Sequence, residues 1–139
     1  MTGHKLGGQT AWSKTVLWIP VFFWLAVIFS LSSVAVPFET SMKFRYQDKL
    51  LHFIEFGVLG ILLARSVHYA HGSNKRLLWI LLIAGIFYGG LDEYHQSFVP
   101  GRCADWRDLA ADGLGLVFCA WGWLAAKGES LVPKRNERE

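Results

Sequence analysis

Charged side chains are scarce in this sequence. They make up 18% of the 139 residues, whereas 53% of the residues are apolar and 7 are Trp. A soluble protein of this size has too little interior to bury so much apolar surface. The chain also lacks any run of Lys and Arg interleaved with aromatic residues, the pattern of a nucleic-acid-binding surface. The composition therefore predicts a protein that uses lipid as the solvent for its apolar surface, with no nucleic-acid partner.

Cysteine is rarer still, with 2 residues, and no familiar catalytic motif is present. Cys103 and Cys119 lie about 24 Å apart if the chain between them is helical, so a disulfide bond between them is not expected. Cys103 stands in a predicted turn and Ser97 has no evident base beside it, so neither residue is a strong candidate nucleophile. A Gly-rich phosphate-binding loop is also missing.

What the sequence does contain is four apolar segments, at about 15–36, 48–69, 77–96 and 105–126. The first is uncharged over its whole length, and a helix of about 20 residues spans the hydrocarbon core of a bilayer. We expect Pro20 in the first turns of this helix and Pro37 to end it. The predicted fold class is all-α, an integral membrane bundle of four transmembrane helices. Residues 1–14 form an N-terminal segment, 15–126 the membrane domain and 127–139 a polar tail.

The distribution of Lys and Arg predicts the topology, because cytoplasmic loops carry an excess of these residues. With four crossings, nine of the 14 Lys and Arg lie on the side of both termini, and five lie on the other side. We therefore expect both termini to be cytoplasmic and the connections near 37–48 and 97–105 to face outward. Gly85 and Gly89 form a small-xxx-small pattern, which suits close helix packing either within the bundle or across a homo-oligomer.

Three of the segments carry polar residues in the layer that this topology brings to the outer face. Helical spacing puts Asp48, His52 and Glu55 on one stripe. It puts Asp92 and Gln96 on one face, with Glu93 pointing about 100° away. The complete set is Asp48, Lys49, His52 and Glu55 in the second segment; Asp92, Glu93, His95 and Gln96 in the third; and Asp105, Asp108 and Asp112 in the fourth.

Ionisable residues inside apolar segments are costly, and their default interpretation is functional. Glu55 and Asp112 lie about 10 Å inward from the starts of their helices. His52 beside Glu55 looks like half of a pair, whereas Asp48 and Asp105 can also be explained as partners of helix N-terminal dipoles. The catalytic candidates are His52, Glu55, Asp92, Glu93, Asp108 and Asp112. The same residues except Glu93 are candidate ligands of a divalent metal, Mg²⁺, Mn²⁺ or Zn²⁺.

The connection between the third and fourth segments holds a turn signal followed by a cation. Pro100-Gly101 pairs a fixed φ with a residue that tolerates positive φ, and it would place Arg102 over the acid layer. There Arg102 either pairs with an acid or grips a phosphate or carboxylate. Lys49, Gln96 and Arg102 are the candidate binding residues. His4, His68 and His71 are interpreted as ordinary surface residues.

These motifs resemble a family. The strings Asp48-Lys49-x-x-His52, Asp92-Glu93-x-x-Gln96-x-Phe98-x-Pro100-Gly101-Arg102 and Asp108-x-x-x-Asp112-x-x-Gly115 are similar to the VanZ-like bacterial membrane proteins, as is Phe29-Ser-Leu-Ser-Ser33. The resemblance covers about residues 20–120 and implies a multi-pass protein of the bacterial inner membrane. The family's namesake is linked to teicoplanin resistance, which suggests cell-envelope lipids or wall precursors as partners. Family members often have Asn where this chain has Asp112.

Three functions remain open at this stage. The first is a resistance-type protein that binds an envelope lipid head group, with Lys49 and Arg102 holding its anionic part. The second is a membrane-embedded, metal-dependent enzyme that acts on a phospho- or acyl-lipid through the acids and His52. The third is a small transporter that uses the acids as a proton relay, for which four helices are few unless the protein oligomerises.

Overall fold

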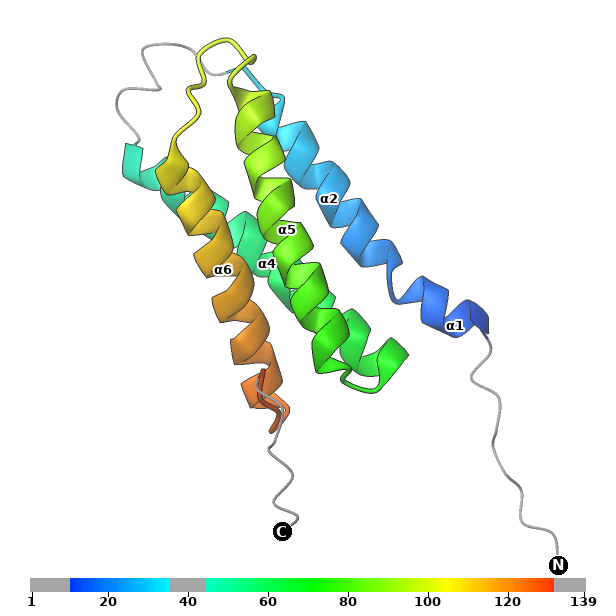
Figure 1. The fold of residues 1–139 in the computed structure, drawn as a ribbon. Coiled ribbons are helices and arrows are strands. Elements are labelled where there is room, and N and C mark those ends of the chain that lie inside the picture. The colour runs from blue at the N-terminus through cyan, green and yellow to red at the C-terminus, as the bar shows by residue number, and fades with distance from the viewer. Residues whose placement is uncertain (1–10, 36–44, 132–139) are drawn as a thin grey trace, which may run out of the picture.

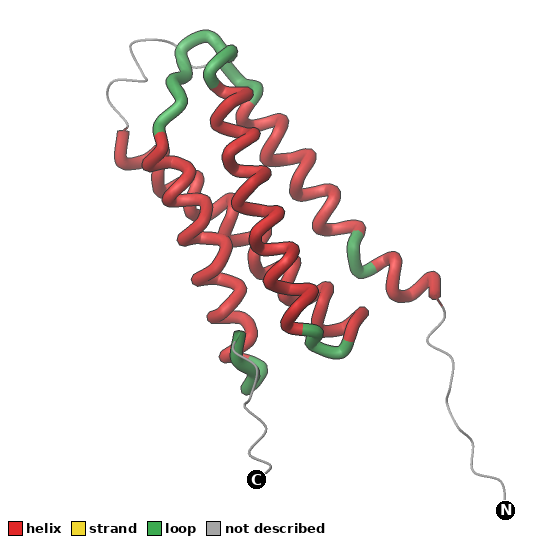
Figure 2. Tube along the Cα trace, in the orientation of Figure 1, coloured by secondary structure: helices red, strands yellow, loops and turns green. Residues whose placement is uncertain are grey.

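Five helices make up the part of the chain that the structure describes. This computed structural model describes residues 11–35 and 45–131, and these ranges contain no strand. The helices are α1 (Ala11–Val16), α2 (Ile19–Ser32), α4 (Arg45–His71), α5 (Lys75–Gln96) and α6 (Trp106–Ala126). Figures 1 and 2 show the long helices side by side in one bundle, with successive helices running in opposite directions. The all-α fold class is confirmed.

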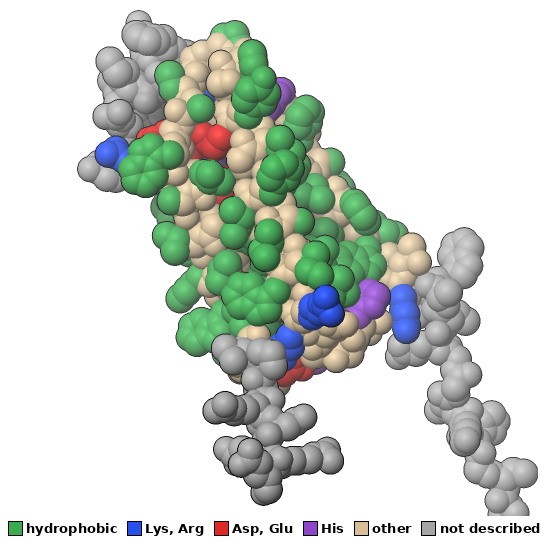
Figure 3. Space-filling view, viewed as in Figure 1, with side chains coloured by type: hydrophobic (Ala, Val, Ile, Leu, Met, Phe, Trp, Pro, Cys, Tyr) green, Lys and Arg blue, Asp and Glu red, His purple; other side chains and the backbone are tan. Residues whose placement is uncertain are grey.

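Four stretches of this bundle are long and apolar enough to cross a membrane: Lys14–Ser32, Gln47–His71, Lys75–Gln96 and Trp106–Ala126. Large apolar side chains point outward along them, and Phe22, Phe87 and Leu114 are each at least 66% exposed. Figure 3 shows apolar side chains over the middle of the visible face, with charged ones gathered toward the two ends. This surface suits lipid contact, so the chain is a multi-pass membrane protein.

The first span is interrupted, which differs from the continuous helix predicted from about residue 15 to 36. Pro20 lacks an N–H and its ring obstructs the carbonyl four residues earlier, so the chain turns at Leu17 and Trp18 before α2 begins. The carbonyl of Leu17 instead accepts a hydrogen bond from Ser66 Oγ of α4 at 2.8 Å. At its other end α2 stops at Ser32, and Pro37 lies outside the described residues.

Glycines set the spacing of the helices that carry the polar residues. A Cβ on Gly60 of α4 would lie 2.1 Å from the carbonyl oxygen of Leu116, and one on Gly115 of α6 would lie 2.2 Å from that of Phe53. The backbones of α4 and α6 therefore touch directly. A Cβ on Gly85 of α5 would lie 2.8 Å from Leu116 Cδ2, so the small-xxx-small face packs within the bundle.

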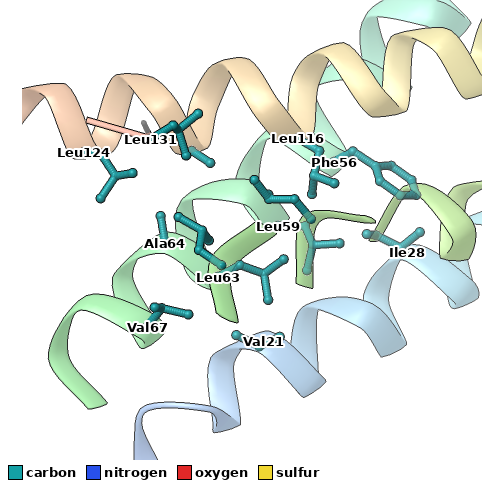
Figure 4. Packing of buried hydrophobic residues seen from close by; sticks show 13 residues of the cluster. Val21, Ile28, Phe56, Leu59, Leu63, Ala64, Val67, Leu116, Leu124 and Leu131 are labelled. Atoms are coloured by element: carbon teal, nitrogen blue, oxygen red, sulfur yellow. The ribbon is translucent and has the colours of Figure 1, made fainter. Parts of the chain in front are cut away.

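The apolar core runs along the middle of the bundle (Figure 4). Ile28, Phe56 and Leu116, from α2, α4 and α6, are completely buried in it. Past the end of α6 the chain folds back, so that Leu131 joins the core with 7% of its surface exposed. Trp79 Nε1 donates a hydrogen bond to the Leu131 carbonyl at 3.3 Å. The first residues of the predicted polar tail therefore pack against the bundle.

A tight turn joins α4 to α5, and a longer connection that contains a turn, residues 97–105, joins α5 to α6. Asn74 caps α5 by accepting a hydrogen bond from the Leu77 N–H at 3.0 Å. Between α5 and α6, Gly101 has a φ of 82° and the Arg102 N–H donates to the Val99 carbonyl at 3.1 Å. The turn predicted from Pro100-Gly101 is confirmed, because a positive φ at its third residue is what such a turn requires of glycine.

Candidate functional site

Ionisable side chains gather at the end of the bundle where α5 ends and α4 and α6 begin. We call this group the His52 cluster; it comprises Asp48, Lys49, His52, Glu93, Asp105, Asp108 and Asp112. The exposed fraction of the side chains falls from the rim of the bundle inward: it is 46% for Asp48, 4% for His52 and 0% for Asp112. The cluster therefore reaches from the rim of the bundle into its interior.

His52 lies at the centre of the cluster between two carboxylates. Its Nδ1 is 3.0 Å from Asp112 Oδ1, and its Nε2 is 3.9 Å from Glu93 Oε1. An ionised carboxylate only accepts hydrogen bonds, so Nδ1 is the donor in this contact when Asp112 is ionised. His52 thus lies within 4 Å of an acid on each of the next two helices, Glu93 of α5 and Asp112 of α6.

Glu55, however, is not the partner of His52. Its side chain is partly buried, and its carboxylate has no hydrogen bond or ion pair with another described residue. Asp112 is the partner of His52 instead of Glu55. The direct contact of α4 with α6 at Gly60 and Gly115 brings the His52 face of α4 against α6. The interpretation of His52 and Glu55 as a pair is therefore wrong.

Lys49 joins the start of α4 to the start of α6. Its Nζ donates to Asp108 Oδ1 at 2.5 Å and to Asp105 Oδ2 at 3.0 Å. Asp105 also caps α6 by accepting the Arg107 N–H at 3.0 Å, which agrees with its predicted role at a helix start. This N–H, together with the Lys49 ammonium, lowers the pKa of the partly buried Asp105 carboxyl below its usual range.

Two buried carboxylate oxygens in the cluster have no hydrogen-bond partner among the described residues. Glu93 Oε2 accepts the backbone N–H of Asp105 at 2.8 Å, but Glu93 Oε1 accepts no hydrogen bond. Asp112 Oδ1 is held by His52, but Asp112 Oδ2 is unpartnered. Buried polar atoms of this kind are rare in folded proteins and call for an explanation.

Asp92 belongs to a separate group that faces α2. Its carboxylate accepts a hydrogen bond from Ser32 Oγ at 2.6 Å and one from Gln96 Nε2 at 2.8 Å. Gln96 Nε2 also donates to Ser32 Oγ at 3.0 Å. The predicted shared face of Asp92 and Gln96 is confirmed, and so is the different direction of Glu93. Within the outer layer, Asp92 is hydrogen-bonded to α2, whereas the His52 cluster lies between α4, α5 and α6.

Sequence reasoning did not assign a role to Ser32, whose signal was its place in the Phe29–Ser33 string of the family resemblance. It also missed Gly57 and Gly60, which let α4 approach α6.

At the opposite end of the bundle, His68 is not the ordinary surface residue that was predicted. Its Nδ1 lies 2.9 Å from Glu129 Oε1 and 2.9 Å from Ser73 Oγ. Glu129 reaches it because the chain folds back after α6, and His4 lies outside the described residues.

Arg102 lies over the end of α2 and the rim of the His52 cluster. Its Nη2 donates to the Leu31 carbonyl at 3.2 Å and its Nε to the Val34 carbonyl at 3.4 Å, so it holds the backbone at and just past the end of α2. Its Nη1 is 3.7 Å from Asp48 Oδ1. Of the two roles considered for Arg102, pairing with an acid is observed, but the acid is the exposed Asp48.

The cluster contains two sets of residues with the spacing of a metal site: His52 with Glu93 and Asp112, and His52 with Asp48 and Asp108. In each set, one ligand atom per residue lies within 4.8 Å of the others. Ligands on opposite sides of a metal ion are about 4–5 Å apart for bonds of about 2.0–2.5 Å. Glu93 thus joins the candidate ligands, while Glu55 and Asp92 belong to neither set.

Comparison with known proteins identifies a family. The model of the VanZ/LLP1 family matches residues 4–127 of the chain. No curated protein and no solved structure matches it. The match contains every residue of the His52 cluster and also Arg102, Gln96 and Ser32.

Proposed function

Because the chain belongs to the VanZ/LLP1 family of membrane proteins, we propose that it binds the head group of a cell-envelope lipid or wall precursor at the His52 cluster, in a role that supports glycopeptide resistance. The observation that carries this proposal is the graded exposure of a charged cluster inside a bundle whose outer surface is apolar. A lipid whose tails lie against that surface would present its head group at the rim.

The rim offers the cations that a phosphate or carboxylate requires. The side chains of Lys49 and Arg102 are 25% and 18% exposed. Both hold acids or carbonyls of this chain, which fixes their positions before a ligand arrives. The fork of an Arg side chain suits the geometry of a phosphate or carboxylate. Acids deeper in the cluster would repel an anionic group, so the anionic part of the ligand stays at the rim.

Thermal unfolding of the purified full chain in detergent tests this proposal. A lipid that binds only the folded protein raises its melting temperature by mass action. We expect phosphatidylglycerol to raise the melting temperature more than phosphatidylcholine does, and we expect Lys49→Gln to reduce that difference. Lys75→Gln, at the opposite end of the bundle, is the matched control. Equal stabilisation of the parent by both lipids would refute binding of an anionic head group.

The resistance role requires a cellular measurement. A bacterium that expresses the chain should tolerate more teicoplanin than one that carries an empty vector, and Lys49→Gln should reduce this tolerance while Lys75→Gln does not. Teicoplanin sensitivity that does not change on expression of the parent chain would refute the resistance role, whatever the lipid measurement shows.

A metal-dependent enzyme is the second candidate, and the position of His52 favours it. An imidazole held by one carboxylate and facing another can bind a metal ion or carry a proton. In such an enzyme the metal would activate water or polarise a phosphoryl or acyl group of a lipid. Hydrolysis of a phospholipid by the purified chain, lost in His52→Gln, would place this candidate above binding alone.

A further inference from the structure

The unpartnered oxygens of the His52 cluster face the same part of α5. A Cβ on Gly89 would lie 2.9 Å from Asp112 Oδ2, so this oxygen of α6 sits over the Gly89 backbone. Glu93 follows Gly89 by one helical turn and so shares its face, and side chains on a helix lean toward its N-terminus. Asp112 Oδ2 and Glu93 Oε1 therefore lie over one face of α5, both buried and both without a partner among the described residues.

His52 is oriented toward the same place. Its ring lies between the two carboxylates: Nδ1 is 3.0 Å from Asp112 Oδ1, and Nε2 faces Glu93 Oε1 at 3.9 Å. That distance is too long for a hydrogen bond. Two ligands of one metal ion are separated by about 3–4 Å, so the gap is wide enough for an ion to be shared.

The charges of the cluster also favour a cation. Its carboxylates outnumber the cationic side chains beside them among the described residues, and His52 does not reduce this excess because it must be neutral to bind a metal ion. The carboxylates are those of Asp48, Glu93, Asp105, Asp108 and Asp112. The cationic groups are those of Lys49, Arg102 and Arg107. Like charges inside a low-dielectric bundle are costly unless they are neutralised.

We propose that His52, Glu93 and Asp112 together bind one divalent transition-metal ion, Mn²⁺ or Zn²⁺, between α4, α5 and α6. One imidazole with two carboxylates suits these ions better than Ca²⁺ or Mg²⁺, which prefer oxygen ligands alone. The inference goes beyond head-group binding, because it requires the metal and no lipid. A metal held there would also link the three helices that carry the cluster.

The test uses the full chain without a polyhistidine tag, purified in detergent, stripped with a chelator and then freed of it. Adding Mn²⁺ or Zn²⁺ alone should raise the melting temperature and saturate at one ion per chain. Co²⁺ should bind in the same place, and its visible absorption should show coordination by nitrogen and oxygen. These two measurements use only the parent sequence, so they do not depend on the folding of any variant.

A matched pair of variants then locates the ion. Glu93→Gln removes a proposed ligand and should weaken metal binding at least about tenfold. Glu55→Gln makes the same chemical change on α4, outside both metal-spaced sets, and should bind as the parent does. A parent chain whose melting temperature does not respond to either ion would overturn the proposal. Equal affinities in Glu93→Gln and Glu55→Gln would overturn it as well.

Discussion

Replacing Gly115 by Ala tests the contact that assembles the site. The added Cβ would lie 2.2 Å from the carbonyl oxygen of Phe53, whereas ordinary contacts begin at 3.4 Å, so α6 must move away from α4 by more than 1 Å. The obstructing atom belongs to the backbone and cannot rotate aside. Overpacking of this kind costs about 1–3 kcal/mol. The movement also strains the hydrogen bond of 3.0 Å between His52 and Asp112, and an unsatisfied buried polar group costs a further ~1–3 kcal/mol.

These two terms predict a loss of at least about 2 kcal/mol. At a shift of about 4 °C for each kcal/mol, the melting temperature of Gly115→Ala in detergent should fall by 8 °C or more. Gly122→Ala is the control on the same helix, because nothing lies within 4 Å of a Cβ built there. Ala is also the better helix former, so this control should melt at or above the temperature of the parent. If Gly115→Ala and Gly122→Ala melted together, the direct contact between α4 and α6 would be refuted.

Two further predictions concern the two faces of the membrane and the pH. Cys103 is exposed in the connection between α5 and α6, so a membrane-impermeant thiol reagent added to intact cells should label it. The reagent should spare Cys119, which lies against Gly57. Labelling of Cys103 only after lysis would place this connection in the cytoplasm. The pKa of Asp105 is lowered by folding, so its contribution to stability is present above its unfolded pKa of about 4 and is lost as the pH falls through the folded value. Asp105→Asn keeps a capping side chain but removes the charge, so melting temperatures measured from pH 6 to pH 3 should fall less steeply for this variant than for the parent.

The sequence alone was sufficient to predict the membrane-spanning helices and to reveal the resemblance to a family. Runs of about 20 apolar residues have few alternatives to a helix in a membrane, because lipid offers the backbone no hydrogen-bond partners. Spacing along one helix also predicted that Asp92 and Glu93 face different ways, and the Pro100-Gly101 pair predicted the turn. These features depend on local geometry, which a single segment contains.

Only the tertiary structure decided which side chains meet. The spacing of His52 and Glu55 puts them near one another on α4. The rotation of α4 against α6 is fixed where Gly60 and Gly115 touch the opposing backbones, and it brings His52 into contact with Asp112. Packing likewise brings Arg102 into hydrogen-bonding distance of carbonyls at the end of α2, some 70 residues earlier in the chain. Helical periodicity describes the faces of one helix, but the rotation and depth of neighbouring helices come from packing between distant segments.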